Sequence, residues 1–540
     1  MIGRLTLYNL SLRPIVLLPA LLAAGLLQAE NITTVLLNGK ILTVDPKFST
    51  AEAVAIRDGR IVATGPSTAL RNSDLGKLAG KQGRLIDLEG RTVIPGLIDS
   101  HMHAIRAALS FSTEVNWIGA RSLAEALDRI RAASHSMPPG AWLIVAGGWN
   151  VQQFRENRRP TEAELVAAAP ENPVYVQLGY GWAVMTPKAL EKLHIANDAD
   201  LPAGGKLERD SDGKLTGGIS GAQNAIIALF DRLPVPTPEQ EVEGTKKFFR
   251  ELNRLGLTGV VDPGGNNMTP ESYQALFKVW RGGELTVRVA YSLCGITPGK
   301  EFEELKDLTQ LLPMGFGDAM LRFNGIGERI TWAMNNNNKP TEAEREKYYE
   351  IARWAAERGM SLTMHWPRDD SAGLLLDIFE RVNKEVPIAN LRWSIAHLND
   401  ASPQNLRRMQ ALGVGWTAQP GRSVPPVETA KEIGVVVGAG TDAHRVASYN
   451  PFTALQQFAE GNIARGEALR LYTLGSAWFS HDDAERGSLE PGKLADLAVL
   501  TKDYMTVPEE QIGGIESLLT MVGGKIVYAS GPYAQFEDKH

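Results

Sequence analysis

Two histidines separated by one residue stand at the end of an apolar stretch, in the segment Leu97–His103. Side chains of a strand alternate between its two faces, so His101 and His103 are expected to point to the same side. Two imidazoles at this spacing can bind one metal ion. The same pattern also occurs as a hydrogen-bonded pair without a metal. Taken alone, the pair is compatible with either role.

Other residues of the kinds that bind metals follow later apolar runs. His365 follows Leu362-Thr363-Met364, His397 ends a second run, and Asp442 ends a third. In barrels built from alternating strands and helices, the chemistry lies at the carboxyl ends of the strands. Four of the nine histidines of the sequence stand at such ends. We therefore expect these four to share a metal site with Asp442.

This combination of residues indicates metal-assisted hydrolysis. A divalent ion lowers the pKa of a bound water molecule to about 7 and polarises a carbonyl group. Asp442 is then expected to accept the proton of the attacking water and to return it to the leaving nitrogen, a role worth roughly 10²–10⁴ in rate. A purely structural role for Asp442, as a cap of the loop after Gly440-Thr441, is the alternative.

Eight apolar runs in the central sequence predict the strands that position these residues. They are Leu97–His103, Leu257–Asp262, Leu285–Cys294, Met320–Gly325, Ser361–Trp366, Leu391–Leu398, Gly413–Ala418 and Val435–Asp442. Stretches with helical patterns, such as Thr341–Arg358 and Pro403–Leu412, lie between them. Eight strands that alternate with helices predict an α/β fold with a closed (β/α)8 TIM barrel.

Both ends of the chain predict a small β-sandwich domain. Its expected strands are Thr34–Leu37, Ala53–Ile56, Ile61–Thr64, Arg84–Leu88, Ala495–Leu500 and Met521–Tyr528, the last broken by Gly523-Gly524. Short alternating strands with turn residues between them are typical of such a domain. We expect its two parts at residues 30–92 and 481–540, on either side of the barrel at 93–480. Residues from about 105 to 242 are too long for one connection and predict an insertion over the barrel mouth.

The first residues of the chain differ from the rest. Arg4 and Arg13 precede the apolar stretch Ile15–Leu27, which is followed by Gln28-Ala29. This pattern predicts a signal peptide over residues 1–29, and with it a periplasmic or secreted protein. The stretch is short for a membrane span and contains a proline, so a retained anchor is the weaker alternative. We expect no stable membrane span after cleavage.

Composition narrows the classes of partner. The 540 residues are 44% hydrophobic and carry a formal net charge of −6, which favours large buried cores and gives no support to nucleic-acid binding. The single cysteine, Cys294, lies in an apolar run and is expected to be a buried thiol rather than a nucleophile. We expect a small-molecule substrate and leave a homodimer open.

Several segments together resemble the amidohydrolase superfamily, and within it the family 3 branch that includes N-substituted formamide deformylases. They are Val93–His103, Gly148-Trp149, Arg159-Pro160-Thr161 and Gly487–Leu497. The resemblance covers essentially the whole mature chain and implies a divalent metal, Zn²⁺ above all, as one or two ions. It further implies that four histidines bind the metal and that a strand-eight aspartate contacts the metal-bound water; these residues are His101, His103, His365, His397 and Asp442.

The first departure from the family pattern concerns the metal count. Many relatives carry a lysine on strand four that becomes carboxylated and bridges two metals. The run Met320–Gly325 contains none, and Arg322 cannot be carboxylated. Glu328, just beyond this run, can supply a bridging carboxylate or can be a surface charge. A single-metal site is therefore a second option.

The second departure concerns the substrate. Relatives usually carry a histidine where this chain has Gly181. If that histidine polarises the substrate carbonyl, Tyr180 or Trp182 must replace it, or the substrate differs. Substrate contacts are expected from side chains in the insertion and just after strand ends, which are Tyr180, Trp182, Trp332, Trp366 and His444.

Three functions follow from these residues. The favoured one is hydrolysis of a non-peptide carbon–nitrogen bond in an amide, formamide, urea or cyclic amide. The second keeps the metal but attacks an ester, lactone or phosphoester, because activated water does not select its electrophile. The third is a non-catalytic binding protein that has kept the fold and lost turnover.

Overall fold

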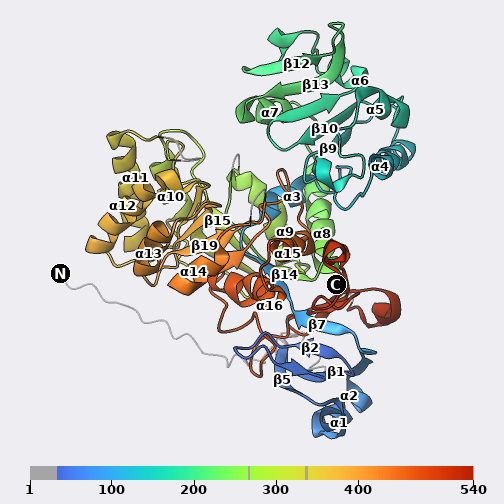
Figure 1. The fold of residues 1–540 in the computed structure, drawn as a ribbon, viewed down its shortest axis with the longest axis vertical. Helices are drawn as coiled ribbons and strands as arrows, with labels where there is room; N and C mark the ends of the chain where they lie inside the picture. Colours follow the sequence, from blue (N-terminus) through green and yellow to red (C-terminus); the bar gives the residue numbers. More distant parts are fainter. Residues whose placement is uncertain (1–32, 266–267, 335–338, 422–423, 539–540) are drawn as a thin grey trace, which may run out of the picture.

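The computed structural model of the chain describes residues 33–265, 268–334, 339–421 and 424–538. Figure 1 shows a central α/β body with a separate lobe on one side and a small β domain, which contains the first described strands, on the other. The expected signal peptide, residues 1–29, lies outside the described residues. Among the helices of the described ranges, none combines the length and the apolar character needed to cross a membrane.

The central body contains all eight expected strands. They are β8 (Leu97–Asp99), β14 (Leu257–Asp262), β15 (Arg288–Leu293), β16 (Leu321–Ile326), β17 (Thr363–Trp366), β18 (Ser394–His397), β19 (Gly415–Ala418) and β20 (Val437–Ala439). They form two four-stranded parallel sheets, in the orders β16-β15-β14-β8 and β17-β18-β19-β20. Most of their residues are buried, as expected for parallel sheets with covered faces.

The two central sheets are joined at both of their edges. A parallel bridge pairs Ile326 at the end of β16 with Leu362 just before β17. On the opposite side, the backbone N–H of Ser100 after β8 donates to the carbonyl of Ala439 in β20, at 3.0 Å. The carboxyl ends of all eight strands therefore lie on one side of the central body.

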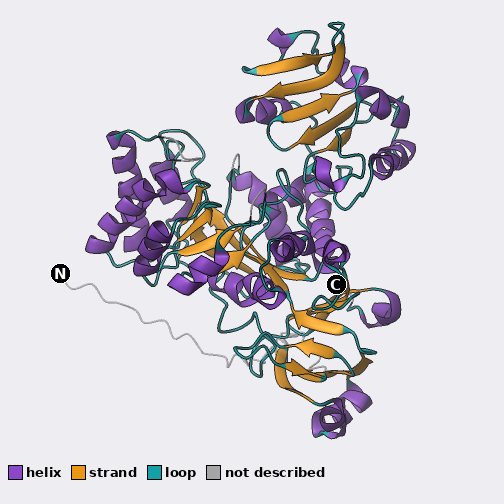
Figure 2. Cartoon of the chain, viewed as in Figure 1, coloured by secondary structure: helices purple, strands orange, loops and turns teal. Residues whose placement is uncertain are grey.

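Helices cover the outside of these strands (Figure 2). They are α3 (Ala104–Ser110), α8 (Pro238–Arg254), α9 (Gln274–Arg281), α10 (Glu301–Thr309), α11 (Glu342–Glu357), α12 (Asp369–Glu385), α13 (Pro403–Leu412), α14 (Val427–Ile433), α15 (Pro451–Glu460), α16 (Arg465–Arg470) and α17 (Ser476–Phe479). The two helices expected from sequence are α11 and α13. Thr341 and Ser402 cap their first turns, and α13 ends at Gly413 with φ of 67°, which glycine adopts readily.

The small β domain is built from both ends of the chain. One sheet has the order β5 (Arg60–Gly65), β4 (Ala53–Arg57), β1 (Thr34–Leu37), β6 (Arg84–Asp87). The other has the order β23 (Lys525–Ala529), β22 (Ser517–Val522), β21 (Leu497–Leu500), β7 (Thr92–Pro95), β2 (Lys40–Leu42), β3 (Thr50–Ala51). Both contribute to one apolar cluster, and α1 (Ser67–Asn72) and α2 (Asp74–Gln82) pack on the first. Because β7 pairs with β21 and β2, this domain extends past residue 92, where we expected the barrel to begin.

The separate lobe comes from the segment in which we expected an insertion. Its sheet has the order β12 (Gly205–Arg209), β13 (Leu215–Gly221), β11 (Trp182–Met185), β10 (Val174–Leu178), β9 (Leu143–Val145). The helices of the lobe are α4 (Leu123–Ser136), α5 (Glu162–Ala168), α6 (Pro187–Lys192) and α7 (Gln223–Phe230). Two apolar clusters give the lobe its own core.

The expected insertion boundaries, 105 and 242, are too wide. Helix α3 overlaps the start of that range and α8 overlaps its end, yet both helices bury their apolar faces in the central core. They also pack closely on each other, since a Cβ atom added to Gly244 in α8 would lie 2.3 Å from the carbonyl oxygen of Ala108 in α3. These helices therefore belong to the central body, and the lobe lies between them in the sequence.

Candidate functional site

His101 and His103 lie in the turn after β8, because the strand ends at Asp99. The buried carboxylate of Asp99 holds this turn: it accepts a hydrogen bond from the backbone N–H of His101 at 3.0 Å. The Nδ1 atom of His103 lies 2.6 Å from the carbonyl oxygen of Gly264. The two rings are 5.5 Å apart and face the same centre, as the sequence predicts, although backbone turns rather than strand alternation bring them there.

Six side chains expected from the sequence converge at this centre. His101 Nε2 lies 3.2 Å from Glu328 Oε2 and 3.8 Å from Asp442 Oδ1. His103 Nε2 lies 3.4 Å from the other oxygen of Glu328, Oε1, and 3.2 Å from Asp442 Oδ1. His397 Nε2 is 3.7 Å from Glu328 Oε2. The ring of His365 is 4.3 Å from that of His397. The candidate ligand atoms form three overlapping groups, each with all its atoms within 4.8 Å of one another.

Glu328 lies in the middle of the cluster and is only 8% exposed, so it is not the surface charge that the sequence also allowed. Its two oxygens face different histidines. Burial raises the pKa of the Glu328 carboxyl, but the imidazoles around it, His103 first, outweigh burial and hold that pKa well below its usual range. The side chain is therefore a carboxylate shared by several imidazoles.

Several buried atoms of this cluster make no hydrogen bond to any part of the chain that the structure describes. They are both ring nitrogens of His101, Nδ1 of His365, Nε2 of His397 and Oε2 of Glu328. Buried polar atoms without partners are rare and costly. Burial also lowers the pKa of His101, and lowers that of His365 to about 4, which keeps these rings neutral with free lone pairs. Imidazole and carboxylate ligands of this kind fit a divalent ion such as Zn²⁺.

Asp442 follows β20 and is the most open of the acidic groups here, with 23% of its side chain exposed. Its backbone N–H donates to the carbonyl of His101 at 2.9 Å. The neighbouring Thr441 hydroxyl donates to Asp99 at 2.7 Å, which ties this loop to β8. Burial raises the pKa of Asp442, but His397 and His103 outweigh it and lower the pKa below the usual value. The lowered pKa keeps the Asp442 side chain in its carboxylate form.

Sequence reasoning missed Gln419, which lies just after β19. It is buried, and neither its amide nitrogen nor its amide oxygen has a hydrogen-bond partner among the described residues. It lies close enough to His397 to raise the pKa of that ring. The sequence could have identified Gln419 by its position directly after the seventh central strand, because each of the other three strands in this sheet already carried a candidate ligand at its end.

Trp366 does not reach the site, contrary to our expectation. It is the last residue of β17 and is completely buried in the central core. The reason is strand alternation: His365 faces the cluster, so its neighbour faces the helices. Trp332 packs on the guanidinium of Arg329, the residue after Glu328, and its indole N–H donates to the carbonyl of Ile296 at 2.8 Å.

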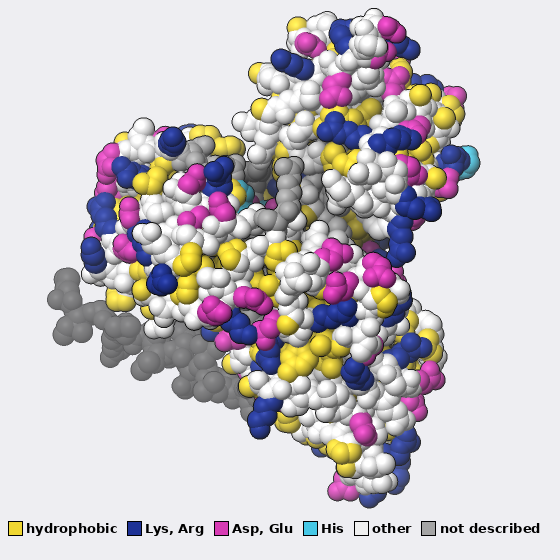
Figure 3. Space-filling model, viewed as in Figure 1, with side chains coloured by type: hydrophobic (Ala, Val, Ile, Leu, Met, Phe, Trp, Pro, Cys, Tyr) yellow, Lys and Arg dark blue, Asp and Glu magenta, His cyan; other side chains and the backbone are white. Residues whose placement is uncertain are grey.

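The other expected substrate contacts line two cavities between the lobe and the central body, where the surface is hollowed (Figure 3). The larger, about 1080 Å³, is lined by Trp182 and Gly181 from the lobe and by Thr441 from the central body. The smaller, about 420 Å³, is lined by Tyr180. His444 is buried beside the smaller one, with Nε2 3.5 Å from a carboxylate oxygen of Glu114. Within the described ranges, Tyr180, Trp182 and His444 form no hydrogen bond or ion pair with a candidate metal ligand.

Comparison with known proteins gives a consistent result. The model of the amidohydrolase family matches residues 84–528. N-substituted formamide deformylase from Arthrobacter pascens is 26% identical, over 91% of this chain and 98% of that protein. A metal-dependent hydrolase from Pyrococcus horikoshii OT3 aligns with a TM-score of 0.60 and 22% identity, over 88% of this chain and 99% of that one. Atrazine chlorohydrolase from Arthrobacter aurescens TC1, solved with zinc, has a TM-score of 0.53 and 17% identity, over 92% and 95%. The likeness to the two solved structures concerns the fold.

Proposed function

This chain belongs to the amidohydrolase family, and on that premise we propose that it cleaves a non-peptide carbon–nitrogen bond in an amide, formamide, urea or cyclic amide. One observation carries the proposal. Four imidazoles and two carboxylates meet at one buried centre, and several of their atoms have no other partner in the described chain. The similarity to a deformylase of N-substituted formamides over nearly its full length supports the class of bond.

We infer that the centre would hold one or two divalent ions, with Zn²⁺ the ion that best suits imidazole and carboxylate ligands. The ligands would be His101, His103, His365, His397, Glu328 and Asp442. Glu328 belongs to two of the three ligand groups, which supports a shared carboxylate in place of the absent strand-four lysine. When bound, such an ion lowers the pKa of water to about 7 and polarises the scissile carbonyl.

The chain itself supplies the proton transfers. Asp442, ionised and open on one side, accepts a proton from the attacking water on its carboxylate. The hydroxyl adds to the carbonyl carbon, the carbon–nitrogen bond breaks, and Asp442 returns the proton to the leaving nitrogen. The hydrogen bonds from Thr441 to Asp99 and from Asp442 N to His101 O hold the carboxylate in place for both steps.

We also interpret the eight central strands as one closed (β/α)8 barrel and the two terminal sheets as a β-sandwich. The bonds at both edges of the central sheets and the shared apolar cluster of the terminal sheets support this reading.

We further propose export to the periplasm or beyond, based on the amino-terminal pattern, and a homodimer stays open. The mass of exported protein tests cleavage: a mature chain beginning near Glu30 is expected, and an intact amino terminus would contradict it.

The direct test is metal analysis of the purified protein followed by turnover of a substrate panel. The panel contains an N-alkylformamide, an N-acyl amine, a substituted urea, a cyclic imide and matched esters and lactones. We expect one or two zinc ions per chain and turnover of at least one nitrogen compound. Turnover of esters or lactones alone would replace the proposed bond class. Bound metal without any turnover would favour a binding protein of this fold.

A further inference from the structure

We propose that the substrate carries a carboxylate, and that the guanidinium of Arg329 binds it beside the metal ligands with help from Arg106. This inference deepens the proposed function, on which it rests, because it names the substrate class of the same site. The carboxylate is the part of the substrate that does not react. It would orient the scissile bond toward Asp442.

Arg329 is a buried cation that makes no ion pair with any residue the structure describes. It directly follows Glu328, is only 2% exposed, and none of its three guanidinium nitrogens has a hydrogen-bond partner in the described ranges. The Trp332 ring covers the guanidinium, with its centroid 3.9 Å from Cζ. Glu328 is the adjacent carboxylate, but its oxygens face the histidines. A buried arginine stays charged and leaves five donors to be satisfied.

Arg329 is one of three arginines that follow candidate metal ligands in the sequence. Arg106 comes three residues after His103, and Arg445 comes three residues after Asp442. Arg445 has a nearby anion, since its Nη1 lies 3.7 Å from a Glu114 oxygen and donates to the carbonyl of Ala146 at 3.1 Å.

The other two arginines lack such a match. Arg106 forms no ion pair within the described part of the chain, and its Nε makes no hydrogen bond there. Glu114 is shared between Arg445 and His444, so it cannot also neutralise Arg106 and Arg329. Arg329 is therefore a buried guanidinium for which the described residues offer no hydrogen-bonding carboxylate, and an anionic ligand would supply one.

The geometry places Arg106 and Arg329 around one small turn beside the cluster. A Cβ atom added to Gly265 would lie 2.9 Å from His103 Nδ1 and 3.6 Å from Arg106 Nη1. On the other side of this turn, the Cys294 thiol donates to the carbonyl of Gly265 at 3.0 Å. Burial lowers the pKa of Arg329; Cys294, Glu328 and Tyr180 lie near enough to oppose that shift, and Arg106 lies near enough to add to it.

The smaller cavity offers room for the rest of such a substrate. Its polar part is lined by Arg106, Arg445 and Tyr180, together with the carboxylates of Glu114, Asp231 and Glu241. Its apolar part is lined by Leu109, Ile144, Ile227, Phe230 and Met268. An N-acyl or N-formyl amino acid with an apolar side chain fits this division: its carboxylate matches the planar fork of a guanidinium in two parallel hydrogen bonds, and its side chain contacts the apolar wall.

The first experiment compares two substrates that differ only in the carboxylate, N-formylphenylalanine and N-formylphenethylamine, with the zinc-loaded enzyme. Charge-assisted hydrogen bonds are worth a selectivity of roughly 10–100-fold in kcat/KM. We expect the acid to be preferred by that factor, and Arg329→Met to reduce the ratio to near one. Arg368→Met is the matched control, because Arg368 is exposed and pairs with Asp370 at 3.0 Å; it should keep the wild-type ratio. Equal ratios in wild type and Arg329→Met would overturn the inference.

The second experiment measures binding without turnover, using metal-free protein and calorimetry with phenylacetate and phenethyl alcohol as probes. Phenylacetate should bind wild type at least about tenfold more tightly than Arg329→Met, and the alcohol should not distinguish them. Arg329→Lys keeps the charge and loses the fork, so intermediate affinity is expected even if the Met variant folds poorly. Equal affinity of wild type and both variants would overturn the inference. Arg329-dependent binding without turnover of any panel compound would keep the carboxylate site and refute the proposed hydrolysis.

Discussion

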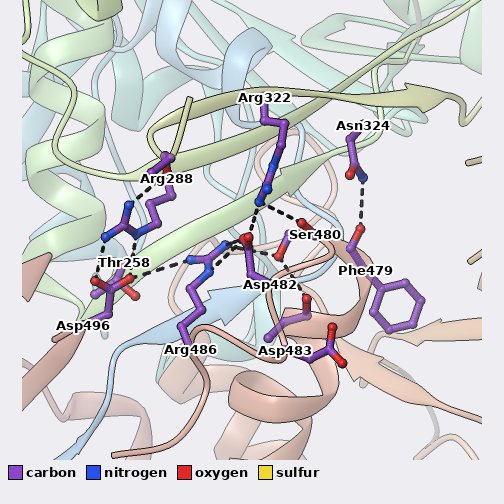
Figure 4. A network of polar contacts seen from close by, with 12 residues as sticks. Thr258, Arg288, Arg322, Asn324, Phe479, Ser480, Asp482, Asp483, Arg486 and Asp496 are labelled. Atoms are coloured by element: carbon purple, nitrogen blue, oxygen red, sulfur yellow. Dashed lines mark hydrogen bonds and ion pairs between the residues drawn. The ribbon is translucent and has the colours of Figure 1, made fainter. Parts of the chain in front are cut away.

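Buried charges gather at both ends of the central strands, and the protein pairs them more completely at the amino ends than at the carboxyl ends. At the amino ends, the arginines and aspartates form a paired network (Figure 4). Arg288 binds Asp496 with two nitrogens, at 2.8 and 3.0 Å. Arg486 lies 2.7 Å from Asp482, which also pairs with Arg322. Each of these guanidiniums faces a carboxylate.

At the carboxyl ends the same kinds of atoms are left without partners. The imidazoles of His101, His365 and His397, the carboxylate of Glu328 and the guanidinium of Arg329 all contain buried atoms with no hydrogen-bond partner in the described chain. Buried charge by itself is therefore no sign of function, because structural ion pairs also bury charge. What distinguishes the candidate site is that the fold brings donors and acceptors together and does not satisfy them.

The largest expected effect comes from removing ligands at the unmatched end. His101→Ala and His103→Ala should lose bound metal and turnover together, because each removes an imidazole from the cluster. Metal content per chain and kcat/KM are the measurements. His135→Ala is the control, since His135 is exposed on α4 in the lobe. If both variants kept the wild-type metal content, the unpartnered imidazoles at the carboxyl ends of the central strands would not be metal ligands, and the contrast with the amino ends would lose its meaning.

Asp442→Asn should separate chemistry from metal binding. The amide keeps the shape of the side chain but cannot accept the proton, so turnover should fall roughly 10²–10⁴-fold. Metal should largely remain, because the four histidines are unchanged. Single-turnover kinetics with parallel metal analysis checks this. Near-normal turnover would exclude Asp442 as the base and transfer that role to another group of the cluster.

Disrupting the paired network should change stability rather than chemistry. Asp496→Ala leaves Arg288 buried without its partner, which costs about 3–5 kcal/mol; denaturant unfolding measures the loss. The double variant Arg288→Met, Asp496→Leu replaces the pair by apolar groups and should recover much of that stability. Turnover per folded molecule should stay close to wild type in both. A loss of turnover without a loss of stability would show that the two ends are coupled.

The smallest effect concerns His481, which is half-buried near the same network. Burial lowers its pKa from 6.5 to about 4, and Nε2 lies 2.9 Å from the Ser361 hydroxyl. Between these two pKa values the unfolded chain binds a proton that the folded one does not. Stability should therefore fall as pH drops from about 6.5 to about 4.

Replacing His481 by Asn isolates this contribution. His481 has a φ of 58°, which Asn tolerates better than most residues. The variant should show a flatter dependence of unfolding free energy on pH over the same window, with unchanged metal content. An equally steep dependence in the variant would assign the acid sensitivity to other groups.

Much of this architecture follows from local sequence. Each of the eight central strands is a short apolar run, and such runs predict buried parallel strands without knowledge of their neighbours. His365 and His397 were found because they end such runs, and His101 and His103 because their spacing is unusual. The lobe was predicted because the segment that contains it is too long for one connection. Its borders were predicted wrongly, because the amphipathic patterns of α3 and α8 do not say whether these helices pack on the lobe or on the central core.

The sequence by itself determined which residues stand at strand ends, because strand propensity, apolar runs and turn residues act over a few neighbouring positions. Only the tertiary structure decided where those side chains point and what they meet. Glu328 was equally compatible with the surface and the centre, and Trp366 was expected to contact substrate, until the packing of β16 and β17 set their directions. The unpartnered guanidinium of Arg329 had no sequence signal at all. Whether a buried charge is matched depends on groups far away in the chain, such as Cys294 and Tyr180, and that pairing exists only after the chain has folded.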